Sequence, residues 1–309
     1  MNLNQEAISF SLDSSSGLNS ALDRLVSLLG EPVKLLGLGE ALHGGEEILT
    51  FRNRLFQRLV ERHGYSAIAL ESSFTRGHLV NEHVAGCGSS SYEAVEEAGF
   101  SHGFGRLEAN RELVEWMRRY NADTSHSIKL QFYGFDAPTE MSYADSPSRV
   151  LHFVLDWFSA LDDARGNEYR ECMESLIGRD SDWEDPATLF DPAKSIGLSA
   201  AARQLRIEVE DLIAELEARR PELIAGSSKD RYCEAVHYAR LARWLLVYHA
   251  VMAEKSSQRT SRLLGIRDAC MAHNLAYILS CEQERGRTLA YAHNSHLKKG
   301  RMQWQFGDE

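Results

Sequence analysis

Several features that mark particular classes of protein are missing from this 309-residue chain. Its five cysteines are scattered without a C-x-x-C pair, and an odd number suits reduced thiols better than a disulfide framework. Basic residues are outnumbered, since 34 lysines and arginines face 45 aspartates and glutamates, which gives a formal net charge of -11. Binding to a nucleic-acid backbone depends on clustered basic side chains. We therefore expect a cytoplasmic protein that does not bind nucleic acid.

Long apolar stretches and several signature motifs are also absent. No stretch reaches the roughly 18 uncharged apolar residues of a membrane span, and the N-terminal MNLNQEAISFSLDSSSG lacks the basic region and apolar run of a secretory signal. The chain contains no G-x-S-x-G, no G-x-x-x-x-G-K-[ST], no G-x-G-x-x-G after a strand and no H-E-x-x-H. These absences argue against a membrane partner, a serine-nucleophile esterase and a phosphate loop. The sequence does not indicate the oligomeric state.

The patterns that are present predict an α/β protein. Four apolar runs stop at polar residues, and their near-continuous apolar character is typical of strands covered on both faces of a parallel sheet. Helical periodicity fills the first intervals, at 17–30 and 46–64, and strand–helix–strand order at this spacing indicates a βαβ unit. The four predicted strands are 33–40, 66–72, 128–136 and 287–294.

The middle of the chain has a different pattern. From about 145 to 282 the pattern predicts long helices and no strands. A polar, proline-bearing loop at 179–195 interrupts these helices and could be mobile or face a ligand. We expect a central, mainly parallel sheet flanked by helices, with a large helical insertion or cap. The expected divisions are 1–144 for the first part of the α/β core, 145–282 for the helical insertion with its bracing helix, and 283–309 for the last core strand.

Polar side chains follow each predicted strand at its carboxyl end. Because ligands of open parallel sheets bind in the crevice beyond these ends, we expect the side chains to converge on one site. They are Glu40, His43, Glu71, Asp136, His293 and His296.

The first strand end, G-L-G-E-A-L-H-G-G, presents Glu40 and His43 together. A histidine beside a carboxylate is fixed in one tautomer and is suited to act as a general base for water. The alternative is a helix-capping loop with an incidental histidine. Arg52, on the next helix, is either a ligand for a substrate carboxylate or oxyanion, or a surface arginine paired with Glu46 or Glu47.

The later strand ends each allow two interpretations as well. Glu71 is either a partly desolvated functional carboxylate or a partner for nearby amides, and Asp136 lies before Pro138 and could simply form a turn. His293 and His296 could bind a divalent metal or stabilise the negative charge of a tetrahedral intermediate without one. The possible metal ligands are Glu40, His43, His293 and His296.

A predicted helix at 262–279 places Arg267, Cys270, Met271 and Asn274 on one face. Arginine and asparagine on a core-facing stripe need polar partners, so they either brace the site or cross the inner surface of the cap. His273 lies off this face, and for it and the remaining histidines we expect a solvated or structural role.

The segment GLGEALHGGEEILTFRNRLFQRLVERHGYSAIALES resembles the opening signature of the erythromycin esterase family, a G-E-x-x-H-G followed by an arginine and a strand that ends in glutamate. Later blocks are similar to those of the family and occur in family order: YGFD at 133–136, RDACMAHN at 267–274 and AHNSH at 292–296. The resemblance implies hydrolysis of a macrocyclic lactone or another ester by activated water, with no covalent acyl-enzyme. Macrolides are therefore the first substrates to consider, and their hydrolysis would imply a role in antibiotic resistance.

Carried over by position, the family pattern implies that His43 is the general base. It implies that the site contains Glu40, His43, Arg52, Glu71, His293 and His296, and that Arg267 and Asn274 are substrate-binding or supporting residues. Asp136 is added to the supporting residues because of its placement at a strand end. The chain departs from the pattern at His273, where a carboxylate is common, and at Glu46 and Glu47, which follow the H-G-G turn. It also stops soon after AHNSH, and this early stop suggests a fragment or a shortened version.

A second hypothesis comes from a different class of protein. The same G-E-x-x-H strand end also resembles a related haem- or iron-binding fold. The alternative is therefore a non-catalytic, or a metal- or haem-binding, protein that uses the same pocket for a small molecule.

Overall fold

A computed structural model of the chain describes residues 10–12, 14–29, 33–89, 91–140 and 143–300. It contains two compact units, called here the sheet unit and the helical unit. The sheet unit comprises Met1–Glu71, Gly77–Gly134 and Ile278–Glu309, and the helical unit comprises Ser72–Arg76 and Phe135–Tyr277.

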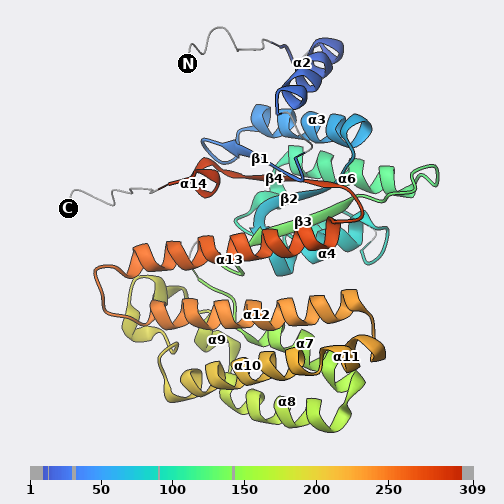
Figure 1. The fold of residues 1–309 in the computed structure, drawn as a ribbon. Helices are drawn as coiled ribbons and strands as arrows, with labels where there is room; N and C mark the ends of the chain where they lie inside the picture. The colour runs from blue at the N-terminus through green and yellow to red at the C-terminus, as the bar shows by residue number, and fades with distance from the viewer. Residues whose placement is uncertain (1–9, 13, 30–32, 90, 141–142, 301–309) are drawn as a thin grey trace. The chain divides into compact units, whose positions relative to one another are not determined.

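The sheet unit is built on a sheet of four strands (Figure 1). They are β1 (Leu35–Glu40), β2 (Tyr65–Ser73), β3 (Gln131–Asp136) and β4 (Arg287–His293), in the order β1-β4-β2-β3. β1 pairs with β4 in parallel up to Glu40 opposite His293, and β2 pairs with β4 in parallel up to Leu70 opposite Tyr291. The last strand in the sequence therefore lies between the first two, and the carboxyl ends of all three are neighbours.

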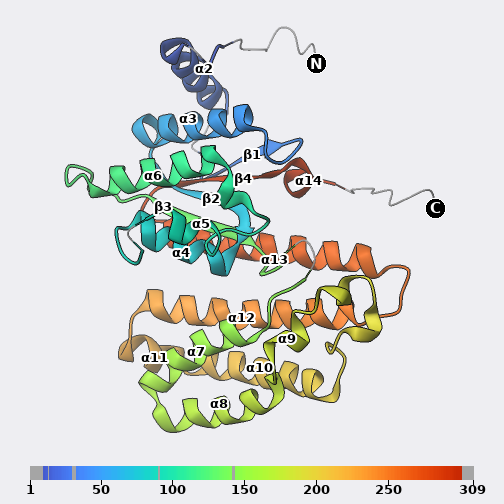
Figure 2. The ribbon, with the colours of Figure 1, turned by 180° about the vertical axis from the view of Figure 1, so that it is seen from behind.

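Helices bury apolar side chains against this sheet. α3 (Glu46–His63) ends at Gly64, whose left-handed backbone (φ 68°) is typical of a helix terminus. It packs on α6 (Glu108–Ala122), and in Figures 1 and 2 these two helices lie next to each other over the strands. Phe56 from α3, Met117 from α6 and Ile68 from β2 share one core. The remaining elements are α2 (Ser15–Leu28), α4 (Phe74–Val84), α5 (Glu93–Glu96), η1 (Phe104–Arg106) and α14 (Asn294–Leu297).

The helical unit contains four helices in cyclic contact. α7 packs on α8, α8 on α10, α10 on α12 and α12 on α7, which is the arrangement of a helix bundle. Buried, mostly apolar side chains of α12 lie on most sides of the helix, as expected for a helix inside such a bundle. None of the helices in the described part of the chain has the length and apolarity needed to cross a membrane. The elements are α7 (Ser148–Leu161), α8 (Asp163–Ile177), α9 (Asp180–Trp183), η2 (Pro186–Leu189), η3 (Pro192–Lys194), α10 (Ala200–Ala218), α11 (Arg220–Gly226), α12 (Lys229–Met252) and α13 (Arg259–Glu282), whose residues from Ile278 onward belong to the sheet unit.

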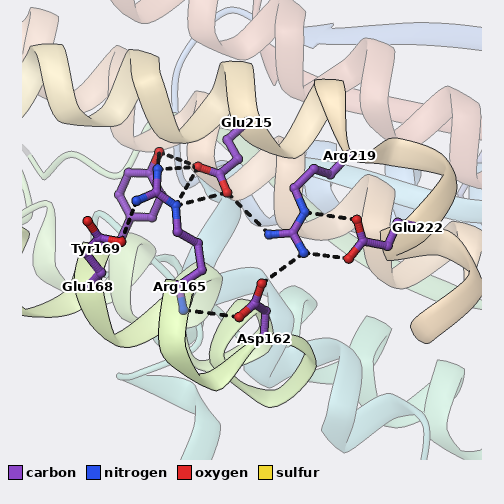
Figure 3. A network of polar contacts seen from close by, with 7 residues as sticks. All are labelled: Asp162, Arg165, Glu168, Tyr169, Glu215, Arg219 and Glu222. Atoms are coloured by element: carbon purple, nitrogen blue, oxygen red, sulfur yellow. Dashed lines mark hydrogen bonds and ion pairs between the residues drawn. The ribbon is translucent and has the colours of Figure 1, made fainter.

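A network of charged side chains ties α8 to α10 and α11 (Figure 3). Arg165 donates from Nε and Nη2 to the carboxylate of Glu215, at 2.9 and 2.6 Å to Oε2. Arg219 extends the network to Asp162 at 2.9 Å and to Glu222 at 2.6 Å. The hydrogen bond from Arg165 is the main reason that the pKa of Glu215 lies below its ordinary value. Connected pairs of this kind stabilise a fold more than isolated surface pairs do.

The predicted parallel sheet with a large helical part is confirmed, with small differences at the edges of elements. The third strand begins at Gln131 instead of 128, and Ile128 remains half exposed. The segment 179–195 is not a simple loop, because it forms three short helical turns and buries Trp183, whose indole donates to the carbonyl of Ile177 at 2.8 Å. Gly30 and the end of the 283–309 segment lie outside the described residues, and the domain boundaries at 144 and 282 stay a prediction.

Candidate active site

Three neighbouring strand ends of the sheet unit form the base of the site. Glu40 is the last residue of β1, His293 is the last of β4, and Glu71 lies in β2. The backbone N–H of His293 donates to Glu71 Oε2 at 2.7 Å, which ties β4 to β2 at this point. The short helix α14 starts directly after β4 and places His296 Nε2 at 3.1 Å from Glu71 Oε1. Two carboxylates, each only 5% exposed, thus lie on either side of His293.

His43 lies in the turn between β1 and α3. Gly44 has a left-handed backbone (φ 81°), which lets the chain turn sharply after the strand. His43 Nδ1 is 2.6 Å from Glu40 Oε1, so the carboxylate accepts the Nδ1 proton and fixes the tautomer. The other ring nitrogen, Nε2, lies 3.9 Å from Glu71 Oε1. The imidazole is therefore held at Nδ1 and directs Nε2 toward the second carboxylate.

Gly39 allows α14 to approach β1. A Cβ atom at this position would lie 2.1 Å from Asn294 Oδ1, well inside van der Waals contact. A larger residue would displace the side chain of Asn294, the first residue of the helix that carries His296.

Tyr291 holds the second oxygen of Glu40. Its hydroxyl donates to Glu40 Oε2 at 2.6 Å, and burial raises the pKa of Tyr291 above its ordinary value, so the phenol stays neutral and acts as a donor. The guanidinium of Arg52 lies over the Tyr291 ring, 4.8 Å from its centroid. Burial lowers the pKa of Arg52 to about 10, which still leaves it charged at neutral pH. Glu40 is thus fixed by both of its oxygens beside a buried positive charge.

Arg52 is 1% exposed, so its interpretation as a surface arginine is wrong. Its Nη2 donates to Asn53 Oδ1 at 2.7 Å and to Asn110 Oδ1 at 2.8 Å. Glu46, its predicted surface partner, instead accepts the backbone N–H groups of Glu108 and Ala109, both at 3.1 Å, at the start of α6. The sequence could not show this, because α3 carries four arginines and only one of them faces the core.

A small cavity of about 20 Å³ lies next to these side chains. Its polar lining comes from Glu40, Arg52, Glu71, Asn110 and Tyr291. A volume of this size holds about one water molecule, and a water needs two to four polar partners to be stable in the interior. The cavity therefore has room for a single water molecule beside Glu40 and Glu71.

Both ring nitrogens of His293 have partners in the structure. Nε2 lies 3.0 Å from the carbonyl oxygen of Ala41, and Nδ1 lies 2.7 Å from Ser295 Oγ. These contacts tie the turn that carries His43 to the end of β4. Within the described ranges of the chain, no group of three or more His, Cys, Asp or Glu side chains is arranged to hold a metal ion.

Asp136, Arg267 and Asn274 come together in the helical unit. Asp136 is fully buried, and Arg267 donates to both of its oxygens, at 2.9 and 2.5 Å. Asn274 Nδ2 donates to the carbonyl oxygens of Phe135 and Asp136, while its Oδ1 lies 2.9 Å from His237 Nε2. Burial lowers the pKa of His237 to about 3, so this histidine is neutral and Nε2 is the donor. The face predicted on 262–279 therefore braces the end of β3, and a role of its residues in substrate binding stays a prediction.

Tyr291, Asn110 and Phe104 also belong to this constellation, although the sequence did not identify them. The tyrosine in the apolar run RTLAYAH was a signal, because a buried phenol needs a hydrogen-bond partner. Asn110 in α6 and Phe104 at the start of η1 lie far from the motif in sequence, and nothing in their local pattern distinguishes them.

Comparison with curated proteins shows similarity to two erythromycin esterases. The type II enzyme of Escherichia coli is 23% identical over 288 residues, which is 89% of this chain and 63% of the enzyme. The type I enzyme of Escherichia coli is 26% identical over 124 residues, 40% of this chain and 29% of the enzyme. The chain thus spans less than two thirds of the length of either relative.

Solved structures show the same fold. A protein from Bacillus cereus superposes with a TM-score of 0.73 at 20% identity, over 95% of this chain and 66% of that one. A succinoglycan biosynthesis protein gives 0.68 at 20% identity, over 94% and 64%. The erythromycin esterase EreC, as a histidine-to-asparagine mutant in its open conformation, gives 0.67 at 19% identity, over 89% and 64%.

The family model described as erythromycin esterase matches residues 60–308. This range begins after Glu40, His43 and Arg52 and includes Glu71, His293 and His296. Since the match covers most of the chain, the chain belongs to the erythromycin esterase family.

Proposed function

We propose that the chain hydrolyses a carboxylic ester or a macrocyclic lactone by general-base activation of water, without a covalent acyl-enzyme. The observation that carries this proposal is the placement of His43, which Glu40 holds at Nδ1 while Nε2 faces Glu71 across 3.9 Å. A water molecule can bridge two polar groups that lie more than about 3.5 Å apart. Membership of the erythromycin esterase family supports an esterase in the coarse sense.

In the proposed reaction, a water molecule lies between His43 Nε2 and Glu71 Oε1. His43 Nε2 takes one proton of this water as its oxygen attacks the carbonyl carbon, and Glu71 accepts a hydrogen bond from the other proton. Glu40 stabilises the imidazolium that forms. When the tetrahedral intermediate collapses, the C–O bond to the leaving group breaks and the imidazolium returns its proton to the leaving alkoxide.

Positive charge near the carbonyl oxygen stabilises this intermediate. His296 lies against Glu71, and Arg52 contributes a buried cation that interacts electrostatically with Glu40. His293 acts through structure, because its ring contacts hold the turn that carries His43.

A screen of esters and lactones, beginning with macrolides, tests the proposal. The product must gain the mass of one water. His43→Ala should lower kcat by about 10²- to 10⁴-fold, the usual contribution of a general base. The matched control is His78→Ala, because His78 is similarly exposed and its Nε2 is paired with Glu82 at 3.4 Å on α4. Wild-type turnover in the His43 variant would overturn the mechanism.

A further inference from the structure

An aromatic side chain from outside the strand ends lies against the proposed base. The Phe104 ring is 5.2 Å from the His43 ring, measured between centroids and tilted by 45°. The His293 ring lies at the same distance from His43. His43 is itself 39% exposed and sits in a glycine-containing turn, so the rings packed against it help to set the orientation of the imidazole. Contacts with these two rings restrict its tilt.

The loop that carries Phe104 has a tightly determined backbone. His102 has a left-handed backbone (φ 59°), the one positive φ found outside glycine in the described part of the chain. Such a conformation costs about 1–3 kcal/mol and persists where the surroundings enforce it. A Cβ atom on Gly105 would lie 1.8 Å from the carbonyl oxygen of Glu96, and the Tyr92 hydroxyl donates to the Gly105 carbonyl at 2.7 Å. The surroundings of the loop therefore fix where Phe104 lies.

A chain of hydrogen bonds connects this loop to the buried part of the site. Arg52 donates to Asn110 Oδ1 at 2.8 Å, and Asn110 Nδ2 donates to the carbonyl oxygen of Phe104 at 2.8 Å. Arg52 also lies over the ring of Tyr291, the donor to Glu40. The same cation thus supports both sides of His43, through Glu40 and through Phe104.

We propose that Phe104 is a positioning residue for His43. Its ring restricts the orientations of the imidazole, so that Nε2 stays directed toward Glu71 and Nδ1 stays on Glu40. The role of Phe104 in turnover rests on the proposed function, whereas its role in holding the imidazole does not.

The test compares Phe104→Ala with Phe104→Leu, which keeps apolar bulk at the position. Phe104→Ala should lower kcat by about 10- to 100-fold while KM changes little, since small misplacements of a catalytic group cost up to about 10²-fold. Phe104→Leu should restore most of the loss. The matched control is Phe51→Ala, because Phe51 stacks on Phe10 at the same 5.2 Å in the sheet unit and loses a comparable ring contact.

The second readout needs no substrate. The ¹⁵N NMR signals of His43 should report one tautomer, protonated at Nδ1, in the wild type and in Phe51→Ala. In Phe104→Ala they should broaden or shift toward a mixture of tautomers. Unchanged His43 signals in folded Phe104→Ala would overturn the proposal, as would a kcat equal to that of Phe51→Ala. If the wild type cleaves no ester, the proposed function fails and the NMR comparison still decides the role of Phe104.

Discussion

Tyr291→Phe removes a single oxygen atom from the proposed site. The tyrosine hydroxyl donates to Glu40 Oε2 at 2.6 Å, and the carboxylate uses its other oxygen to hold His43. The phenyl ring remains beneath Arg52, so the packing and the cation–π contact are kept. The change therefore isolates the effect of fixing Glu40.

The size of the effect follows from the hydrogen bond. A bond to a charged group contributes about 1.5–3 kcal/mol, and the free energy of unfolding should fall by about that much. If the whole amount were expressed in the transition state, kcat would fall by about 10- to 150-fold. Because Glu40 keeps its bond to His43, we expect the lower end, a loss of about tenfold.

The chain offers a close control for this substitution. Tyr133 donates to Glu282 Oε1 at 2.8 Å in the same unit, and Glu282 is as deeply buried as Glu40. Tyr133→Phe should lower the free energy of unfolding by a similar amount and leave kcat unchanged. Urea unfolding and steady-state kinetics on both variants measure the two effects. If the two variants lose equal stability and neither loses activity, the orientation of Glu40 does not contribute to the reaction.

Two further predictions concern stability. Gly39→Ala places a Cβ atom against the Asn294 side chain and should lower the free energy of unfolding by about 1–3 kcal/mol. It should also lower kcat, because Asn294 begins α14, the helix that carries His296. Thermal unfolding and steady-state kinetics will show whether stability and kcat fall together. Glu215→Gln removes the carboxylate whose pKa Arg165 depresses in the folded state. A depressed carboxyl pKa stabilises the fold above the unfolded pKa, and this stability is lost as the pH falls through the folded value. Urea unfolding should therefore show a lower free energy of unfolding for Glu215→Gln than for wild type at pH 7, and this difference should shrink as the pH falls below about 4. A difference independent of pH would contradict the role of the charge.

The strand ends were predictable from the sequence because their pattern is local. Each apolar run stops at a polar residue, and parallel strands place those residues at one edge of the sheet. Glu40, Glu71 and His293 follow that rule and lie together. The strand order, with β4 between β1 and β2, could not be read from the chain, and it is this order that places His293 between the two carboxylates.

The partners that fix these residues were harder to predict because they depend on packing. Arg52 looks like the other arginines of α3 in the sequence, but in the fold it donates to Asn110, which is 58 positions away. Asp136 lies near the carboxyl end of its strand, as Glu71 does, yet Arg267 from α13 neutralises it in a buried pair. Long-range pairing of this kind leaves no periodicity in the sequence.

A single turnover in ¹⁸O-labelled water tests the central claim most directly. With enzyme in excess over an ester that the chain cleaves, activated water should place one ¹⁸O atom in the product carboxylate, and the intact protein should show neither an acyl adduct nor label. Label found instead in the carboxylate of Glu40 or Glu71, or a transient acyl adduct on the protein, would contradict the account, because a side chain would then have attacked the ester.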